Sequence, residues 1–113
     1  MNEIERDIVR FKHILEECEN IASFLGGDKT SLLTARALER SLQIIGEACR
    51  TISPTSKSDY SKIPWADIIG MRNILVHEYY RVDVETIWDV AEHKIPALKD
   101  WIIGILEKSN DHP

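Results

Sequence analysis

The hydrophobic positions of the chain recur at alternating intervals of three and four residues, which is the spacing of amphipathic helices. The first of these patterns predicts a helix from about Ile4 to Leu25, with Asn2 as its N-cap. Gly26 and Gly27 are expected to end this helix through a left-handed turn. The positions predicted to face the core are Ile4, Ile8, Phe11, Leu15, Cys18, Ala22 and Leu25.

A second pattern predicts a helix from about Ser31 to Ile52, with Asp28 or Thr30 as its cap. Gly46 lies inside this helix, where a close crossing with another helix would explain it. The polar segment Ser53 to Ser61 predicts a loop that joins two helices of one domain. The predicted inner positions of the helix are Ala35, Leu38, Leu42, Ile45, Cys49 and Ile52.

Pro64 is expected to be the first residue of a third helix, which continues into the segment from Met71 to Tyr80. Asp83 is expected to cap a final helix from about Val84 to Glu107, which Pro96 interrupts. The inner positions of this helix are Ile87, Ala91, Ile95, Leu98, Ile102 and Ile105. The sequence has no strand pattern and no internal repeat, so it predicts an all-α helical bundle.

The length of 113 residues favours one domain, residues 1–113, with its own hydrophobic core. No apolar run approaches the roughly 20 residues that span a bilayer, and the acidic amino end lacks the hydrophobic segment of a secretory signal. We therefore expect a cytoplasmic location and no membrane partner. The net charge of -5 argues against an extended nucleic-acid groove, so contact with RNA would need a small cationic site or a partner.

Several common kinds of active site lack their residue patterns here. Cys18 and Cys49 occupy apolar positions and are expected to be reduced core residues. The four histidines show no His-x3-His spacing, and Asp89 with His93 is expected to be an exposed pair, so we expect no metal site. The chain has neither a Gly-x-Ser-x-Gly nucleophile context nor a glycine-rich phosphate loop. The histidines are His13, His77, His93 and His112.

The densest polar chemistry lies between Met71 and Tyr80, in the segment Met-Arg-Asn-Ile-Leu-Val-His-Glu-Tyr-Tyr. Arg72 is a permanent cation that can bind phosphate at two points, and His77 can transfer protons near neutral pH. RNA supplies its own nucleophile, the 2′-hydroxyl, so this pair could cleave a phosphodiester without a metal ion. Asn73 would orient His77 or a phosphate oxygen through a hydrogen bond.

Helix geometry constrains how these residues could meet. At ~100° per residue, Arg72 and His77 are well separated around the axis, whereas Arg72 and Tyr79 lie close together. Either the helix is irregular here, or the site is completed across a symmetric interface. In the alternative interpretation, Arg72 pairs with Glu47 or Asp67, and His77 is a half-buried interface residue.

The same segment resembles a known family. Arg72-Asn73, three apolar residues and His77-Glu78-Tyr79 resemble the Arg-x4-His-x-Tyr motif of the HepT-like branch of the HEPN superfamily. The resemblance covers roughly residues 4 to 98 and implies an antiparallel four- to five-helix HEPN-type bundle that forms a homodimer with a shared cleft. Further landmarks follow in the same order: Arg6-Asp7-Ile8, Ile44-Ile45-Gly46-Glu47-Ala48, Ile63-Pro64-Trp65 and Trp88.

The resemblance also implies roles for individual residues. Arg72 and His77 would be the catalytic pair of an endoribonuclease that uses no cofactor, with Asn73 in support. Arg40 stands where HepT-like sequences carry a basic residue, and Glu47 belongs to the Ile-Gly-Glu-Ala landmark, so both are candidate supporting residues. In the other interpretation, Arg36 and Arg40 lie on a solvated helix face with Glu39 and Glu47 nearby.

Tyr79 is similar in position to the tyrosine that HepT-like toxins present for modification. The resemblance implies that a minimal (MntA-like) nucleotidyltransferase antitoxin, using ATP and magnesium, AMPylates Tyr79. Adenosine linked through a phosphodiester beside Arg72 would occupy the phosphate site and neutralise its cation. The implied protein is the toxin of a toxin–antitoxin system. The rival interpretations are a non-catalytic nucleotide-sensing or scaffolding subunit that binds a nucleotidyltransferase, and a plain helical dimerisation domain.

Overall fold

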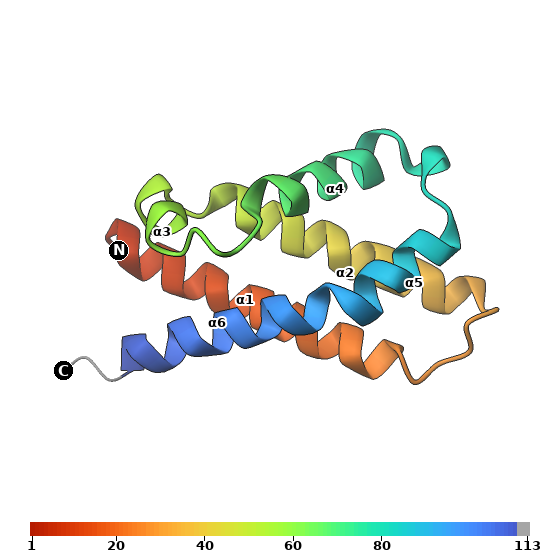
Figure 1. The fold of residues 1–113 in the computed structure, drawn as a ribbon, viewed down its shortest axis with the longest axis horizontal. Coiled ribbons are helices and arrows are strands. Elements are labelled where there is room, and N and C mark those ends of the chain that lie inside the picture. Colours follow the sequence, from red (N-terminus) through yellow and green to blue (C-terminus); the bar gives the residue numbers. More distant parts are fainter. Residues whose placement is uncertain (111–113) are drawn as a thin grey trace.

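Residues 1–110, which the computed structural model describes, form six α-helices and one 3-10 turn (Figure 1). In chain order these are α1 (Glu3–Phe24), α2 (Leu32–Thr51), α3 (Pro54–Asp59), α4 (Trp65–His77), η1 (Tyr79–Arg81), α5 (Val84–His93) and α6 (Ile95–Asn110). α1 and α2 form an antiparallel hairpin, α4 covers α2, and α5 and α6 return over α2 and α1. The predicted all-α bundle is confirmed over the described residues, and its longest dimension is 47 Å.

Side chains cap the first and fifth helices as predicted. The Asn2 side chain accepts a hydrogen bond from the amide of Glu5 at 2.8 Å, and Asp83 accepts one from the amide of Thr86 at 2.8 Å. Each contact satisfies an amide that a helix start would otherwise leave unpaired. α1 and α5 therefore begin within one residue of their predicted starts.

The predicted boundary between α1 and α2 is wrong in its details. Ser31 caps α2 by accepting a hydrogen bond from the amide of Thr34 at 3.2 Å, whereas Asp28 binds the amide and hydroxyl of Thr30 in the preceding turn. α1 ends at Leu25 in a right-handed conformation, and no glycine within residues 1–110 has a positive φ. The double glycine therefore marks the turn without using a left-handed backbone.

The buried face of α1 differs from the predicted seam. Phe11 and Cys18 are buried as expected, but Ile4 is 68% exposed. Ile14 and Ile21 are fully buried in its place. Both sets obey the spacing of three and four residues, so periodicity alone could not choose between them.

The predicted inner faces of α2 and of the last two helices are confirmed. All six positions predicted for α2 are buried, and so are all six predicted for the final helix. Lys94 separates α5 from α6, just before Pro96, because proline cannot supply the amide that a continuous helix needs there. These helices and the buried part of α1 enclose one hydrophobic core.

The segment Ser53 to Ser61 is not only a loop, because it contains the short helix α3. Ser53 caps α3 and Pro54 is its first residue. Asp7 of α1 is 2% exposed and accepts hydrogen bonds from the Ser53 amide at 3.0 Å and the Ser56 hydroxyl at 2.6 Å. The Ser53 hydroxyl also donates to this carboxylate. A buried carboxylate from a distant helix therefore holds α3 in place, which the local sequence did not indicate.

α4 is a regular helix from Trp65 to His77 that packs mainly on α2. Pro64 precedes it as the N-cap rather than as its first residue. The predicted continuation to Tyr80 is wrong, since η1 follows as a separate turn. Leu75 is the one fully buried residue of α4. Within residues 1–110, no helix is both long enough and apolar enough to cross a membrane.

Candidate functional site

Arg72 of α4 lies directly against Gly46 of α2. A Cβ atom on Gly46 would lie 2.1 Å from the Cβ of Arg72 and 2.8 Å from its Cγ. Since carbon atoms in contact are ~3.5–4.0 Å apart, only glycine allows this approach. Glycine inside a helix costs about 1 kcal/mol relative to alanine, so the close crossing accounts for its presence, as predicted.

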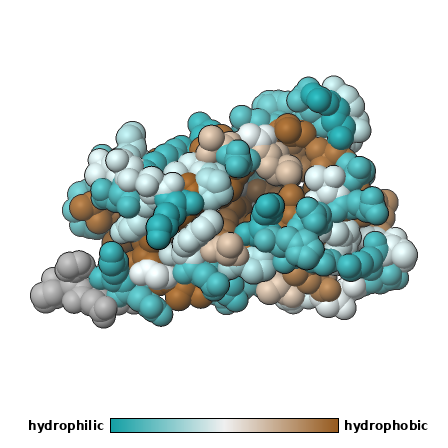
Figure 2. Space-filling view, in the orientation of Figure 1, coloured by the Kyte–Doolittle hydropathy of each residue, from teal (hydrophilic) through white to brown (hydrophobic). Residues whose placement is uncertain are grey.

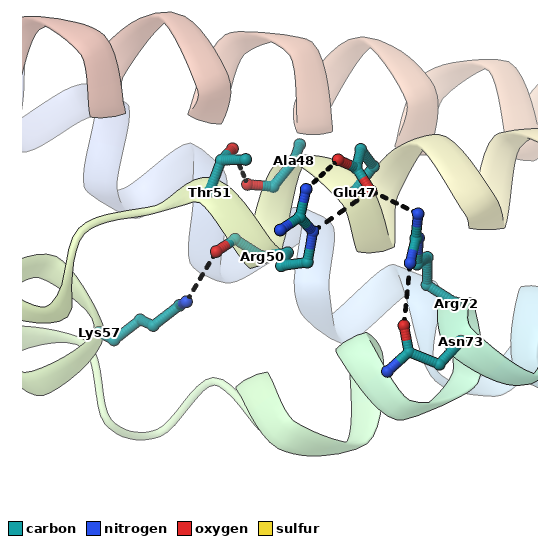
Figure 3. Close-up of polar contacts among 7 residues, drawn as sticks. All are labelled: Glu47, Ala48, Arg50, Thr51, Lys57, Arg72 and Asn73. Atoms are coloured by element: carbon teal, nitrogen blue, oxygen red, sulfur yellow. Dashed lines mark hydrogen bonds and ion pairs between the residues drawn. The ribbon is translucent and has the colours of Figure 1, made fainter.

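Glu47, the next residue of α2, binds two arginines. Figure 3 shows Arg72 and Arg50 reaching Glu47 from opposite sides, with N–O distances of 2.9 Å and 2.6 Å. Arg72 also donates a hydrogen bond from Nη1 to Oδ1 of Asn73 at 3.0 Å. The Arg72 side chain is 22% exposed, so its guanidinium is both fixed and open to solvent on one side. The predicted pairing of Arg72 with Glu47 is present.

Charge explains the protonation state of Glu47. Hydrogen bonds from Arg50, followed by the charges of Arg50 and Arg72, hold the pKa of the Glu47 carboxyl below its ordinary value, against a raising effect of desolvation. Glu47 is therefore an anion at neutral pH. Arg50 was not singled out from the sequence, although its spacing of three residues from Glu47 on one helix would have suggested the contact.

His77 is the last residue of α4 and is exposed. It lies five positions after Arg72, which corresponds to about 140° around the axis of a regular helix. Arg72 faces α2, so the two side chains leave α4 in different directions. The helix is regular through both residues. His77 is exposed in the single chain, and its burial at an interface between two copies stays a prediction.

The two tyrosines lie in the turn η1 beyond the end of α4. Tyr79 and Tyr80 are 61% and 74% exposed, and their rings meet edge to face with centroids 6.1 Å apart. Arg81 pairs with Glu78 at 3.0 Å across the same turn. The expected proximity of Tyr79 to Arg72 assumed one continuous helix, and that basis is lost because α4 ends before Tyr79. The Tyr79 hydroxyl is nevertheless carried on an accessible turn.

A groove of about 640 Å³ runs between α1 and α2, with Arg72 of α4 in its wall. It contains three of the predicted site residues: Arg40, Glu47 and Arg72. Arg10 and His13 of α1 also line the groove, although sequence reasoning did not identify them. Their spacing of three residues placed them on one helix face, but the packing of α1 against α2 was needed to show what that face meets. His77 is not among the groove residues.

Much of the apolar surface of α4 is left uncovered. Ile74 is 37% exposed and Val76 is 41% exposed. A second hollow, of about 460 Å³, lies between α4 and α5–α6 and contains Ile68, Met71 and Trp101 (Figure 2). Exposed apolar side chains beside an apolar hollow are typical of an interaction face.

The remaining candidates for chemistry are structural. Cys18 and Cys49 are free and buried, as predicted, and desolvation raises the pKa of each thiol to about 12. Asp89 and His93 are exposed and 3.8 Å apart, as expected of a surface pair. Between residues 1 and 110, no three histidine, cysteine or acidic side chains gather closely enough to hold a metal ion. His112 lies outside the described residues.

Comparison with known proteins finds relatives along most of the chain. The family model described as "Ribonuclease HepT-like" matches residues 14–105. "Putative RNase TTE0752" of Caldanaerobacter subterraneus subsp. tengcongensis is 41% identical over 103 residues, which cover 86% of this chain and 91% of that protein. "Probable ribonuclease HepT" of Thermococcus cleftensis is 36% identical over 96 residues, covering 82% and 84%. "Putative RNase MJ1380" of Methanocaldococcus jannaschii is 31% identical over 101 residues, covering 84% and 93%. No solved structure matches the chain.

Proposed function

Since the chain belongs to the HepT-like ribonuclease family, we propose that it is a metal-independent endoribonuclease whose catalytic residues are Arg72 and His77. Two copies would form the active unit, and Asn73, Glu47 and Arg40 would support the site. The observation that carries this proposal is the Arg72 guanidinium, held by Glu47 and Asn73 in the wall of a groove.

The held guanidinium is suited to bind a phosphate. It has five N–H donors, and the contacts to Glu47 and Asn73 leave further donors free for phosphate oxygens. Because the side chain is already ordered, little conformational entropy is lost when a phosphate binds. Glu47 would act as a positioning residue, and Arg72 would stabilise the negative charge that develops on the phosphorane oxygens.

A second copy would supply the histidine. Within one chain the two side chains leave α4 about 140° apart, so His77 would reach the phosphate bound by Arg72 of its partner. Ile74 is exposed on the same side of α4 as His77, which supports an interface along this side of the helix. In a two-fold arrangement each surface would meet its own copy, producing two equivalent sites.

The reaction would follow general acid–base chemistry. One His77 would take the proton from the 2′-hydroxyl as its oxygen forms a bond to phosphorus. The bond from phosphorus to the 5′-oxygen would break, and a water molecule would donate a proton to the leaving oxygen. The products would be a 2′,3′-cyclic phosphate and a 5′-hydroxyl. No step requires a metal ion.

The turn η1 would carry the residue that controls the activity, Tyr79. Tyr79 is exposed two residues after His77, so its hydroxyl could attack the α-phosphate of ATP held by a minimal nucleotidyltransferase, releasing pyrophosphate. The AMP group would add a negative charge and a bulky base beside the catalytic helix. The protein would then be the toxin of a toxin–antitoxin pair, with the transferase as its antitoxin.

Purified chain and a labelled RNA test the proposal. We expect cleavage that persists in EDTA, leaves 2′,3′-cyclic phosphate ends, and stops when the 2′-hydroxyl at the cleaved position is removed. Arg72→Ala and His77→Ala should abolish both cleavage and growth arrest on expression, whereas Arg36→Ala, a change on α2 outside the groove, should not. Intact mass after co-expression with the transferase should increase in units of AMP, and Tyr79→Phe should remove the increase.

The rival function is a non-catalytic subunit that binds the transferase. The neutralisation of Arg72 by Glu47 and the net charge of -5 favour this alternative, because both weaken attraction to RNA. It predicts no cleavage by the wild type under any condition, together with stable association with the transferase that survives Arg72→Ala.

A further inference from the structure

The groove beside Arg72 extends well beyond the predicted catalytic pair. Its lining on α2 runs from Arg40 to Thr51, which corresponds to ~16 Å along the helix axis. Successive phosphates of a stacked strand are only ~3.4 Å apart along its axis, so a strand lying in a groove of this length would place more than one phosphate there. Arg10 and His13 form the facing wall on α1.

The register of α1 on α2 places His13 opposite Glu47, the residue that binds Arg72. Asp7 of α1 binds Ser53 directly after α2, and the two helices run antiparallel. His13 lies six residues after Asp7 on α1. Glu47, which binds Arg72, lies six residues before Ser53. By the same register, Arg10 lies near the carboxyl end of α2, and Arg40 lies beyond Glu47 at the opposite end of the groove.

Two of the three arginines that line the groove have no ion-pair partner among residues 1–110. Among residues 1–110, neither Arg10 nor Arg40 forms an ion pair, and Arg40 contacts only the amide of Gln43, at 3.4 Å. By contrast, Arg36 is paired with Glu39 just outside the groove. The guanidinium groups of Arg10 and Arg40, which form no ion pair among residues 1–110, therefore lie on either side of Arg72 along the groove.

We propose that this groove holds the RNA strand that flanks the cleaved bond, with Arg10 and Arg40 binding backbone phosphates on either side of Arg72. His13 donates a hydrogen bond to a phosphate oxygen at the level of Arg72. This inference rests on the proposed ribonuclease function, which it deepens by adding residues of α1 to the binding surface. The groove brings three arginines together on a chain of net charge -5, although it also carries the carboxylates of Glu16, Glu17 and Glu47.

Glu16 and Glu17 also line the groove and give the proposal a second, opposite test. Their carboxylates repel a phosphate strand, so they limit affinity. Removal of the exposed Glu16 charge should therefore strengthen binding, whereas removal of a groove cation should weaken it. A role of these residues in folding alone would not produce opposite changes in RNA affinity.

The experiment measures binding to the full chain separately from cleavage. The probe is a fluorescein-labelled 2′-O-methyl oligonucleotide, which lacks the nucleophilic hydroxyl, and its Kd is measured by fluorescence anisotropy over a salt series. Arg10→Gln and Arg40→Gln should each weaken binding about five-fold at 0.1 M salt and reduce the slope of log Kd against log salt by about 0.7. Lys12→Gln, a neighbouring charge on α1 outside the groove, should leave the slope unchanged. Glu16→Gln should tighten binding, whereas its control Glu19→Gln should not.

The outcomes separate this inference from the proposed function. The inference is overturned if Arg10→Gln and Arg40→Gln behave like Lys12→Gln, or if the wild type does not bind the probe. If the slopes change as expected but unmodified RNA is never cleaved, the groove binds RNA and the catalytic proposal fails. Thermal unfolding of each variant shows whether the fold is kept. Arg40 is exposed, so its replacement should disturb folding least.

Discussion

Replacement of Gly46 by alanine tests whether the close crossing of α2 and α4 sets the position of Arg72. The new Cβ would lie 2.1 Å from the Cβ of Arg72, against a contact distance of ~3.5–4.0 Å, so α4 must shift by roughly 1.5–2 Å at this point. Overpacking of this kind costs about 1–3 kcal/mol, and the gain in helix propensity returns only about 1 kcal/mol. We expect a net loss of up to about 2 kcal/mol in the free energy of unfolding.

Gly104→Ala in α6 is the matched control, because nothing lies within 4 Å of its Cβ position. It should stabilise the protein by about 0.5–1 kcal/mol through propensity alone. Urea unfolding followed by circular dichroism measures both variants. Displacement of Arg72 by more than ~1 Å should also slow RNA cleavage by roughly 100-fold in Gly46→Ala, at concentrations where it is fully folded. The reasoning is refuted if Gly46→Ala stabilises the protein as much as Gly104→Ala and cleaves at the wild-type rate.

Three further predictions concern the anchors of the fold and the site. Asp7→Asn should lower the free energy of unfolding by about 2–3 kcal/mol at pH 7, because it removes the charge-assisted hydrogen bonds that the buried carboxylate accepts from Ser53 and Ser56. Desolvation raises the pKa of Asp7, but the hydrogen bonds from Ser53 and Ser56 outweigh this effect and leave the pKa below 3.8. The wild type should therefore be more stable than Asp7→Asn above that pH, and the difference should be lost as the pH falls through the lowered pKa. Urea titrations at pH 3 and pH 7 measure this difference. Glu47→Gln should slow cleavage by about ten-fold with little change in Tm, since it loosens Arg72 without removing it; a variant with the wild-type rate would show that the clamp is dispensable. Ile74→Asp should give a folded monomer without cleavage activity, measured by sedimentation velocity, whereas Val9→Asp, a similarly exposed apolar site on α1, should not; a dimeric Ile74→Asp would contradict an interface on α4.

The sequence was sufficient wherever a local pattern decides the structure. The inner faces of α2 and of α5–α6 followed from periodicity, because each has only one apolar stripe of the right spacing. The caps Asn2 and Asp83 were predictable because a cap binds amides of its own first turn. The crossing at Gly46 was also predictable, since a helical glycine needs a reason of this kind.

Features that depend on distant parts of the chain were not predictable. The stripe through Ile14 and Ile21 was chosen over the one through Ile4 by packing against other helices. α3 depends on the buried carboxylate of Asp7, and its own sequence reads as a loop. Likewise, the placement of His13 opposite Glu47 follows from the register of α1 on α2, which no motif within either helix specifies.

The division of catalytic labour between two copies is tested most directly by mixing inactive chains. Arg72→Ala and His77→Ala are each expected to be inactive alone. If Arg72 of one copy works with His77 of the other, a mixed dimer regains one intact site, and an equimolar mixture that exchanges subunits should recover about a quarter of the wild-type cleavage rate. If both variants form mixed dimers and the wild type cleaves RNA, but the mixture stays inactive, then the two residues do not act across an interface and the account is contradicted.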